Sequence, residues 1–171
     1  MTATLHAPAG LDDLLLYRLS RLLAVGGSMV IRLCEGRFGI TRREWRVIAR
    51  LAQEQELLSS ALADSIQLDR ARTSRAVSSL VEKKLVRRTA GVSDRRQARL
   101  ALTERGRALH RELFPLVCEI NRGLLSPLSA REVQGLEAAL DALQQQADRM
   151  VLRAELPKAD RRRGRARLAM G

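Results

Sequence analysis

Aromatic side chains are scarce in this sequence: one tryptophan, one tyrosine and two phenylalanines make up 2% of 171 residues. Proteins that hold single-stranded nucleic acid stack its bases on aromatic rings. The scarcity therefore argues against single strands as a partner. There are only two cysteines, Cys34 and Cys118, which by themselves cannot form a disulfide framework or a metal site.

Other features are missing as well. The N-terminal segment MTATLHAPAG has no basic region followed by an apolar run, so no secretory signal is visible. No apolar stretch is long enough to cross a bilayer. The sequence has no cluster of Cys, His and carboxylate residues at metal spacing, no phosphate-binding glycine loop and no nucleophile–base pair. We therefore expect a cytoplasmic protein that is not an enzyme and holds no metal or resident cofactor.

What the sequence has in excess is positive charge. Lysine and arginine number 31 against 19 aspartates and glutamates, which gives a net charge of +12 and a pI near 11.4. Such an excess indicates a polyanionic partner, nucleic acid before an anionic membrane surface. The length favours a single domain that can bury a real core.

The rest of the chain is organised around residues 59–103. A short helix is expected over 60–67 and a second over 70–84. The apolar residues of the second helix, Ala76, Val77, Leu80 and Val81, recur at helical spacing while arginines and serines fall on the other side. A basic hairpin follows, with Leu100 and Leu102 alternating with Arg99 and Ala101 as in a half-buried strand. Helix, helix and hairpin in this order predict a winged helix-turn-helix.

The second helix and the hairpin carry the predicted DNA contacts. Arginine reads guanine edges with two hydrogen bonds, and short hydroxyls can bond bases or phosphates. Asp94 would repel phosphate and is expected to orient a neighbouring arginine. The predicted contact residues are Arg70, Arg72, Thr73, Ser74, Arg75, Ser78, Ser79, Arg88, Ser93, Asp94, Arg95, Arg96 and Gln97.

Long helices are predicted on either side. The first covers residues 11–36, where Gly26-Gly27 interrupts the apolar stripe at roughly 1 kcal/mol per glycine, which close packing of a second chain would offset. Thr41 and Glu44 form a capping box before a helix that presents Trp45, Ile48, Leu51 and Ala52 to a core. Thr103 begins the next helix, which Pro115 should kink or break. Ser129 and Glu132 cap the last helix.

The first and last helices have more apolar surface than a small reading domain can cover. Their expected use is pairing with a second copy in a two-fold dimer. The alternative is one monomeric helical core. The predicted dimer residues are Leu15, Leu19, Leu136, Leu140, Leu143 and Met150.

The predicted class is therefore mainly α with a small β-hairpin wing. Residues 11–156 form one domain, in which 41–103 are a DNA-binding head and 11–36 and 104–156 are a helical dimerisation region. Residues 1–10 and the basic segment 157–171 are expected to be disordered tails.

These residues resemble the MarR (multiple antibiotic resistance regulator) family, from about Leu11 to Met150. The strongest part is Ser93-Asp94-Arg95-Arg96 followed by Leu102-Thr103-Glu104-Arg105-Gly106, similar to the family's wing tip and its Leu-Thr-x-x-Gly turn. Lys84 departs from the glycine that many members carry between recognition helix and wing. The resemblance implies a homodimer whose two winged heads grip near-palindromic double-stranded DNA, regulated by a small ligand.

The resemblance also implies an effector pocket where the first, second and fifth helices meet. An apolar slot with arginines suits a flat anion, so the expected effector is a small aromatic carboxylic acid that releases a repressor. The segment from Leu113 to Asn121 resembles the branch that controls aromatic-acid breakdown. The alternative is that these arginines only solvate helix faces or contact phosphates. The expected pocket residues are Tyr17, Arg18, Arg21, Trp45, Arg46 and His110.

Two other functions remain open at this point. A basic architectural protein would coat DNA without reading its sequence. A thiol redox switch on the same fold would depend on Cys34 or Cys118. Since a sensor cysteine needs exposure and a lowered pKa, the position of Cys34 near a helix C-terminus disfavours it.

Overall fold

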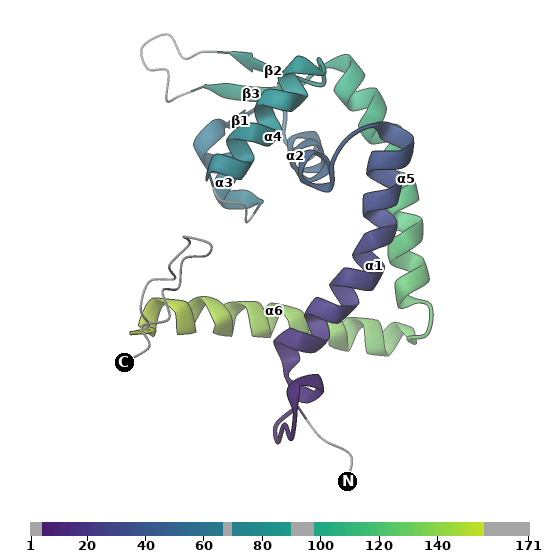
Figure 1. Ribbon diagram of the computed structural model, residues 1–171, viewed down its shortest axis with the longest axis vertical. Coiled ribbons are helices and arrows are strands. Elements are labelled where there is room, and N and C mark those ends of the chain that lie inside the picture. The colour runs from purple at the N-terminus through teal and green to yellow at the C-terminus, as the bar shows by residue number, and fades with distance from the viewer. Residues whose placement is uncertain (1–4, 67–69, 90–97, 156–171) are drawn as a thin grey trace, which may run out of the picture. The chain divides into compact units, whose positions relative to one another are not determined.

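The computed structural model describes residues 5–66, 70–89 and 98–155 (Figure 1). These residues fold into helices and one small antiparallel sheet, which confirms the predicted class. In chain order the elements are a 3₁₀ helix η1 (Leu11–Asp13), α1 (Leu15–Phe38), α2 (Arg42–Gln53), β1 (Leu57–Leu58), α3 (Ser59–Ser65), α4 (Arg70–Glu82), β2 (Val86–Thr89), β3 (Arg99–Leu102), α5 (Glu104–Leu125) and α6 (Ala130–Arg153). None of the described helices is both long and apolar enough to span a membrane.

The chain divides into two compact units, one ending at Leu125 and the other beginning at Ser126. In the first, α2, α3 and α4 pack around the sheet and α1 lies along α5 (Figure 1). Cys34 and Leu113 share one core while Gly26 lies against Leu124, so α1 and α5 run antiparallel. In the second unit α6 has no buried residue.

Both predicted capping boxes are confirmed. The Thr41 amide donates to Glu44 Oε2 at 2.6 Å, and the Glu44 amide donates to Thr41 Oγ1 at 3.2 Å. At the start of α6 the Ser129 amide donates to Glu132 Oε2 at 2.8 Å, and the Glu132 amide donates back to Ser129 Oγ at 3.4 Å. Each pair satisfies two backbone donors that a helix start leaves without partners.

Both predicted boundaries of α1 were wrong. The chain makes the short η1 before α1 begins at Leu15, and α1 runs through Gly36 to Phe38. It ends there because Gly39 adopts a left-handed conformation with φ of 62°, the usual way a glycine ends a helix.

The glycine pair inside α1 serves packing within one chain. A Cβ on Gly26 would lie 3.3 Å from the Leu124 side chain, and one on Gly27 would lie 2.9 Å from Arg42 Nη1. The glycines therefore let α5 and Arg42 approach α1 closely. The space beside the two glycines, which was predicted to accommodate a second chain, is thus taken by Leu124 and Arg42 of the same chain.

The wing contains a strand that the sequence did not suggest. β1 pairs with β3, which in turn pairs with β2, with Leu57 opposite Leu100 and Val86 opposite Leu102. Two residues are too few to show a period-two pattern. Ala101, expected on the exposed side with Arg99, is buried.

The turn from α4 into the wing is built on Lys84, whose φ is +58°. The Leu85 amide donates to Leu80 O and the Lys84 amide to Val81 O, both at 2.9 Å, which is a Schellman helix end. Lys84 thus occupies a left-handed position that usually favours glycine.

This turn is held by the first residues of α5. Thr103 Oγ1 donates to Lys84 O at 2.8 Å and accepts from the Gly106 amide at 3.1 Å. A Cβ on Gly106 would overlap the Leu85 carbonyl group. In the Thr-x-x-Gly pattern, the threonine thus bonds the α4–β2 turn and the glycine allows the start of α5 to contact the backbone of that turn.

The head has one apolar core, to which α2, α3, α4, the sheet and α5 all contribute. Trp45, Ile48 and Leu51 are buried as predicted, but Ala52 is exposed and Val47 is buried instead. Helix α5 continues over the exposed Pro115 as a single helix ending at Leu125, so the expected break does not occur.

Candidate nucleic-acid interface

The outer face of α4 is basic and its inner face is apolar. Ala76, Val77 and Leu80 are buried in the core at the spacing of one helix face. The predicted contact residues that lie exposed on the other side are Arg70, Arg72, Ser74, Arg75 and Ser78. A helix that is packed on one side and carries arginines and serines on the other can enter a DNA major groove.

Two predicted contacts on α4 face inward instead. Thr73 is only 2% exposed, since its position places it on the buried stripe with Ala76 and Val77. Ser79 is half-buried and hydrogen-bonds to the Glu44 carboxylate. Thr73 was therefore wrongly assigned to the contact face, and Ser79 is engaged inside the head. Val81, assigned to the apolar face, is exposed.

The described part of the wing carries a second basic stretch. On β2, Val86 is buried while Arg87, Arg88 and Thr89 are exposed. Arg88 therefore lies where it was expected. The predicted contacts Ser93, Asp94, Arg95, Arg96 and Gln97 lie outside the described residues, as do the segment 157–171 and residues 1–4.

A half-buried ion pair connects the end of α4 to the start of α2. Lys83 Nζ donates to both oxygens of Glu44, at 3.0 and 2.9 Å, and to the Gly39 carbonyl at 2.9 Å. Burial alone would raise the pKa of Glu44, but hydrogen bonds from Ser79, Thr41 and Lys83 together lower it. The carboxylate therefore stays ionised and fixes the end of α4 that leads into the wing.

Sequence reasoning identified Glu44 only as a capping residue and did not pair it with Lys83. The two are 39 positions apart, so no local pattern links them. A glutamate that is only 2% exposed needs a cationic partner, but burial is not visible in one sequence.

Two of the residues predicted for the effector pocket, Trp45 and His110, are in ring contact with each other and with Phe114. The His110 ring is stacked on Trp45, at a centroid distance of 5.6 Å, and on Phe114, at 5.2 Å, and the Trp45 and Phe114 rings are 6.5 Å apart. Burial lowers the pKa of His110, which favours the neutral ring. The pKa of Arg46 is also lowered, mainly by burial and to a lesser extent by the positive charge of Arg42. Phe114 is 48% exposed and was not among the predicted pocket residues.

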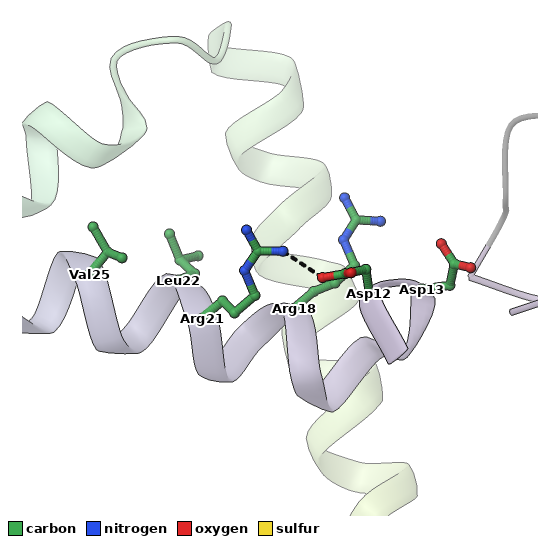
Figure 2. A pocket seen from close by; sticks show the side chains of 6 residues that line it. All are labelled: Asp12, Asp13, Arg18, Arg21, Leu22 and Val25. Atoms are coloured by element: carbon green, nitrogen blue, oxygen red, sulfur yellow. Dashed lines mark hydrogen bonds and ion pairs between the residues drawn. The ribbon is translucent and has the colours of Figure 1, made fainter. Parts of the chain in front are cut away.

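Three other predicted pocket residues lie elsewhere in the chain. Arg18 and Arg21 line a separate cavity of about 620 Å³ at the start of α1, shown in Figure 2, with Asp12 and Asp13. Arg21 Nη1 lies 2.7 Å from Asp12 Oδ1 in an exposed ion pair. Tyr17 is half-buried on the same turn of α1.

The distance between these two groups follows from the antiparallel packing of α1 and α5. Gly26 lies against Leu124, which is about 21 Å along α5 from His110 at ~1.5 Å of rise per residue. Arg18 is two turns further along α1. The single chain therefore does not bring the six predicted residues into one site.

The two cysteines differ in their surroundings. Cys34 is fully buried, and burial together with the neighbouring Glu35 raises its pKa to about 11, despite the opposing effect of Arg42. Such a thiol is protonated and inaccessible, which argues against Cys34 as a redox sensor. Cys118 is half-buried.

The predicted dimer residues form exposed apolar positions on two helices. On α6, Leu136, Leu140 and Leu143 are each about two-fifths exposed and Met150 is 60% exposed. On α1, Leu19 is exposed and Leu15 is half-buried.

Comparison with known proteins gives this arrangement a context. Residues 38–97, which include α2, β1, α3, α4 and β2, match the MarR family. Many solved protein chains share the fold. One is a MarR/EmrR family transcriptional regulator from Acinetobacter sp. ADP1, with 26% sequence identity and a TM-score of 0.75, covering 82% of this chain and 99% of that one.

Two further similar structures belong to regulators with a known binding partner. A MarR family transcriptional regulator from Streptomyces coelicolor, in complex with DNA, is 21% identical with a TM-score of 0.71, covering 78% of this chain and 86% of that one. Bordetella bronchiseptica BpsR, whose DNA binding is regulated by 6-hydroxynicotinic acid, is 19% identical with a TM-score of 0.64, covering 74% and 98%.

Proposed function

We propose that this winged helix-turn-helix protein is a regulator of the MarR family that reads a specific double-stranded DNA sequence. The observation that carries the proposal is the exposed arginine and serine face of α4, fixed from behind by a packed core and by the Glu44–Lys83 pair. The Streptomyces coelicolor relative in complex with DNA supports it.

The roles of α4 and the wing should differ. Arg72 and Arg75 lie on the face that would meet base edges, where a bidentate contact to guanine discriminates by about 1–3 kcal/mol. Arginines of the wing, Arg88 among them, would respond to groove width and phosphate charge.

The test is to measure base preference with duplexes that vary one position at a time. Arg72→Ala or Arg75→Ala should relax preference at one base pair in each half-site. Arg88→Ala should weaken all duplexes evenly. A sharp change of base preference on Arg88→Ala, with none for the α4 variants, would reverse the assignment.

We also propose that the protein acts as a homodimer. Leu136, Leu140 and Leu143 recur at helical spacing on α6 and are exposed in the single chain, as is Leu19 on α1. Apolar rows of this kind are normally covered. A two-fold dimer would place two α4 helices about one DNA turn, ~34 Å, apart on a near-palindromic operator.

The dimer proposal is tested with Leu140→Asp and Leu143→Asp. Each places a carboxylate in the proposed seam, where an unpaired buried charge is strongly unfavourable. The variants should sediment as monomers or precipitate, and should lose operator binding. A variant that stays dimeric would place the seam elsewhere.

The effector proposed for this regulator is a small aromatic carboxylic acid that releases repression, with genes for aromatic-compound breakdown as the regulated class. The Trp45–His110–Phe114 stack offers ring surfaces, and Arg46, on α2 next to Trp45, offers a cation for the carboxylate. Regulation of BpsR by 6-hydroxynicotinic acid supports this class of ligand.

Thermal shift and operator release across a panel of aromatic acids test this proposal, with Arg46→Ala and Arg18→Ala in parallel. Linkage requires that an acid which binds the free protein better must weaken operator affinity by the same factor. If no acid shifts the melting temperature, the effector class is wrong. If the response to the acid survives Arg46→Ala, the acid binds at another place. A response that is then lost in Arg18→Ala would point to the cavity in Figure 2.

A further inference from the structure

A small groove lies between the start of α2 and the outer side of α4. Its volume is about 230 Å³, below the roughly 300–1,000 Å³ of pockets that hold drug-sized molecules. It is therefore sized for one small group of a larger partner. The lining residues are Thr41, Arg43, Glu44, Arg72, Arg75, Ala76 and Ser79.

The negative charge of this groove is buried and its positive charges are exposed. The negative charge, on Glu44, is buried and already occupied by Lys83, Ser79 and the Thr41 amide. The positive charges are on exposed side chains. Among the described residues, Arg43 and Arg75 form no ion pair. An anion in the groove would thus meet guanidinium groups rather than the carboxylate.

The groove is also continuous with the proposed reading face. Arg72 and Arg75 belong both to its lining and to the exposed side of α4. When α4 lies in a major groove, the neighbouring element must pass close to the sugar–phosphate backbone that borders that groove. Arg43 is the residue of α2 that brings a positive charge to the lining of the groove.

We propose that Arg43 binds a backbone phosphate of the duplex whose bases face Arg72 and Arg75. The contact extends the interface from α4 and the wing to α2. This inference rests on the proposed function, since it assumes that α4 enters duplex DNA. A phosphate contact positions the protein and carries no sequence information of its own.

The chain provides a matched control in the adjacent arginine. Arg42 points to α1, since its Nη1 atom would lie 2.9 Å from a Cβ placed on Gly27. Arg42 also lies close enough to influence the pKa of both Cys34 and Arg46. Arg42 and Arg43 thus have the same charge and neighbouring positions but face different surroundings.

The experiment compares Arg43→Gln, Arg43→Lys and Arg42→Gln in the full chain. Affinity is measured by fluorescence anisotropy over a range of salt concentrations, for an operator selected from a random duplex library and for a short duplex of unrelated sequence. Each phosphate contact contributes a slope of about 0.9 to the dependence of log affinity on log salt. A dimer that loses both copies of the contact should lose a slope of about 1.8.

Arg43→Gln should weaken both duplexes by the same factor and reduce the slope, while Arg43→Lys keeps the slope and Arg42→Gln leaves it unchanged. An unchanged slope in Arg43→Gln, alongside a loss of operator affinity in Arg75→Ala, would refute the contact and leave the proposed function intact. Equal slopes for the Arg42 and Arg43 variants, or a change of base preference in Arg43→Gln, would also refute it. Failure of the wild-type protein to bind either duplex would instead contradict the proposed function.

Discussion

The Glu44–Lys83 pair allows a quantitative prediction about what holds α4 in place. Replacing Glu44 with Gln removes the charge and keeps an acceptor for the helix cap, because glutamine also fits a capping box. Glu44 is 2% exposed, but the Lys83 side chain is 36% exposed, so water can partly solvate an unpaired lysine. The expected loss is therefore that of a charged hydrogen bond, about 1.5–3 kcal/mol, rather than the ~3–5 kcal/mol of a fully buried pair.

The assay is chemical and thermal unfolding at one fixed protein concentration, since association with a second copy would add to apparent stability. For a chain of this size the loss corresponds to a fall in Tm of roughly 3–12 °C. In a Lys83→Met background, Glu44→Gln should have a much smaller effect, because the partner is already absent.

The pH dependence follows from the lowered pKa of Glu44. A carboxyl group whose pKa is lower in the folded state stabilises the fold above its ordinary value, here 4.5, and that contribution is lost as pH falls through the folded pKa. The difference between wild type and Glu44→Gln should thus be full near neutral pH and shrink in acid. A loss of less than about 0.5 kcal/mol at neutral pH, as for an exposed pair, would refute this account of the α2–α4 connection.

Further substitutions test the packing described above. Gly106→Ala should destabilise the protein by about 1–3 kcal/mol because the added methyl group meets the Leu85 carbonyl. The control Gly36→Ala, in open space on α1, should not destabilise it. Equal effects of the two substitutions in unfolding experiments would contradict the close approach of Gly106 to Leu85. Lys84→Gly should stabilise by about 0.5–1 kcal/mol by relieving a left-handed residue, and a destabilised variant would argue against that conformation. In a Cys118→Ser variant, Cys34 should resist thiol reagents until the protein unfolds, and rapid labelling of the native protein would contradict its burial and its pKa of about 11.

The helices were predictable from sequence where local chemistry defines them. Thr41 and Ser129, each followed by a glutamate three positions later, fixed two helix starts correctly, because a capping box is a short-range interaction. The apolar spacing in α4 identified most of its buried face, but two residues at the edge of that face were placed on the wrong side, since Thr73 is buried and Val81 is exposed. A helix face has no sharp edge in sequence, and threonine is compatible with either environment.

The long-range features were not predictable. Lys83 meets Glu44, Leu124 meets Gly26, and Arg43 shares a groove with Arg75 only because the chain folds back on itself. The pocket prediction joined Arg18 to His110 because both lie on helices of the expected site, but position along each helix separates them. The departure at Lys84, in contrast, was visible in sequence and does mark an unusual backbone conformation.

The most direct test of the central claim is the ratio between specific and non-specific DNA affinity. The wild-type protein is titrated at one physiological salt concentration with an operator selected from a random duplex library and with an unrelated duplex of the same length. A reader of sequence through α4 should prefer the operator by at least about 10³. A ratio close to one would mean that the basic surface only coats DNA, and it would contradict the assignment of α4 as a reading helix.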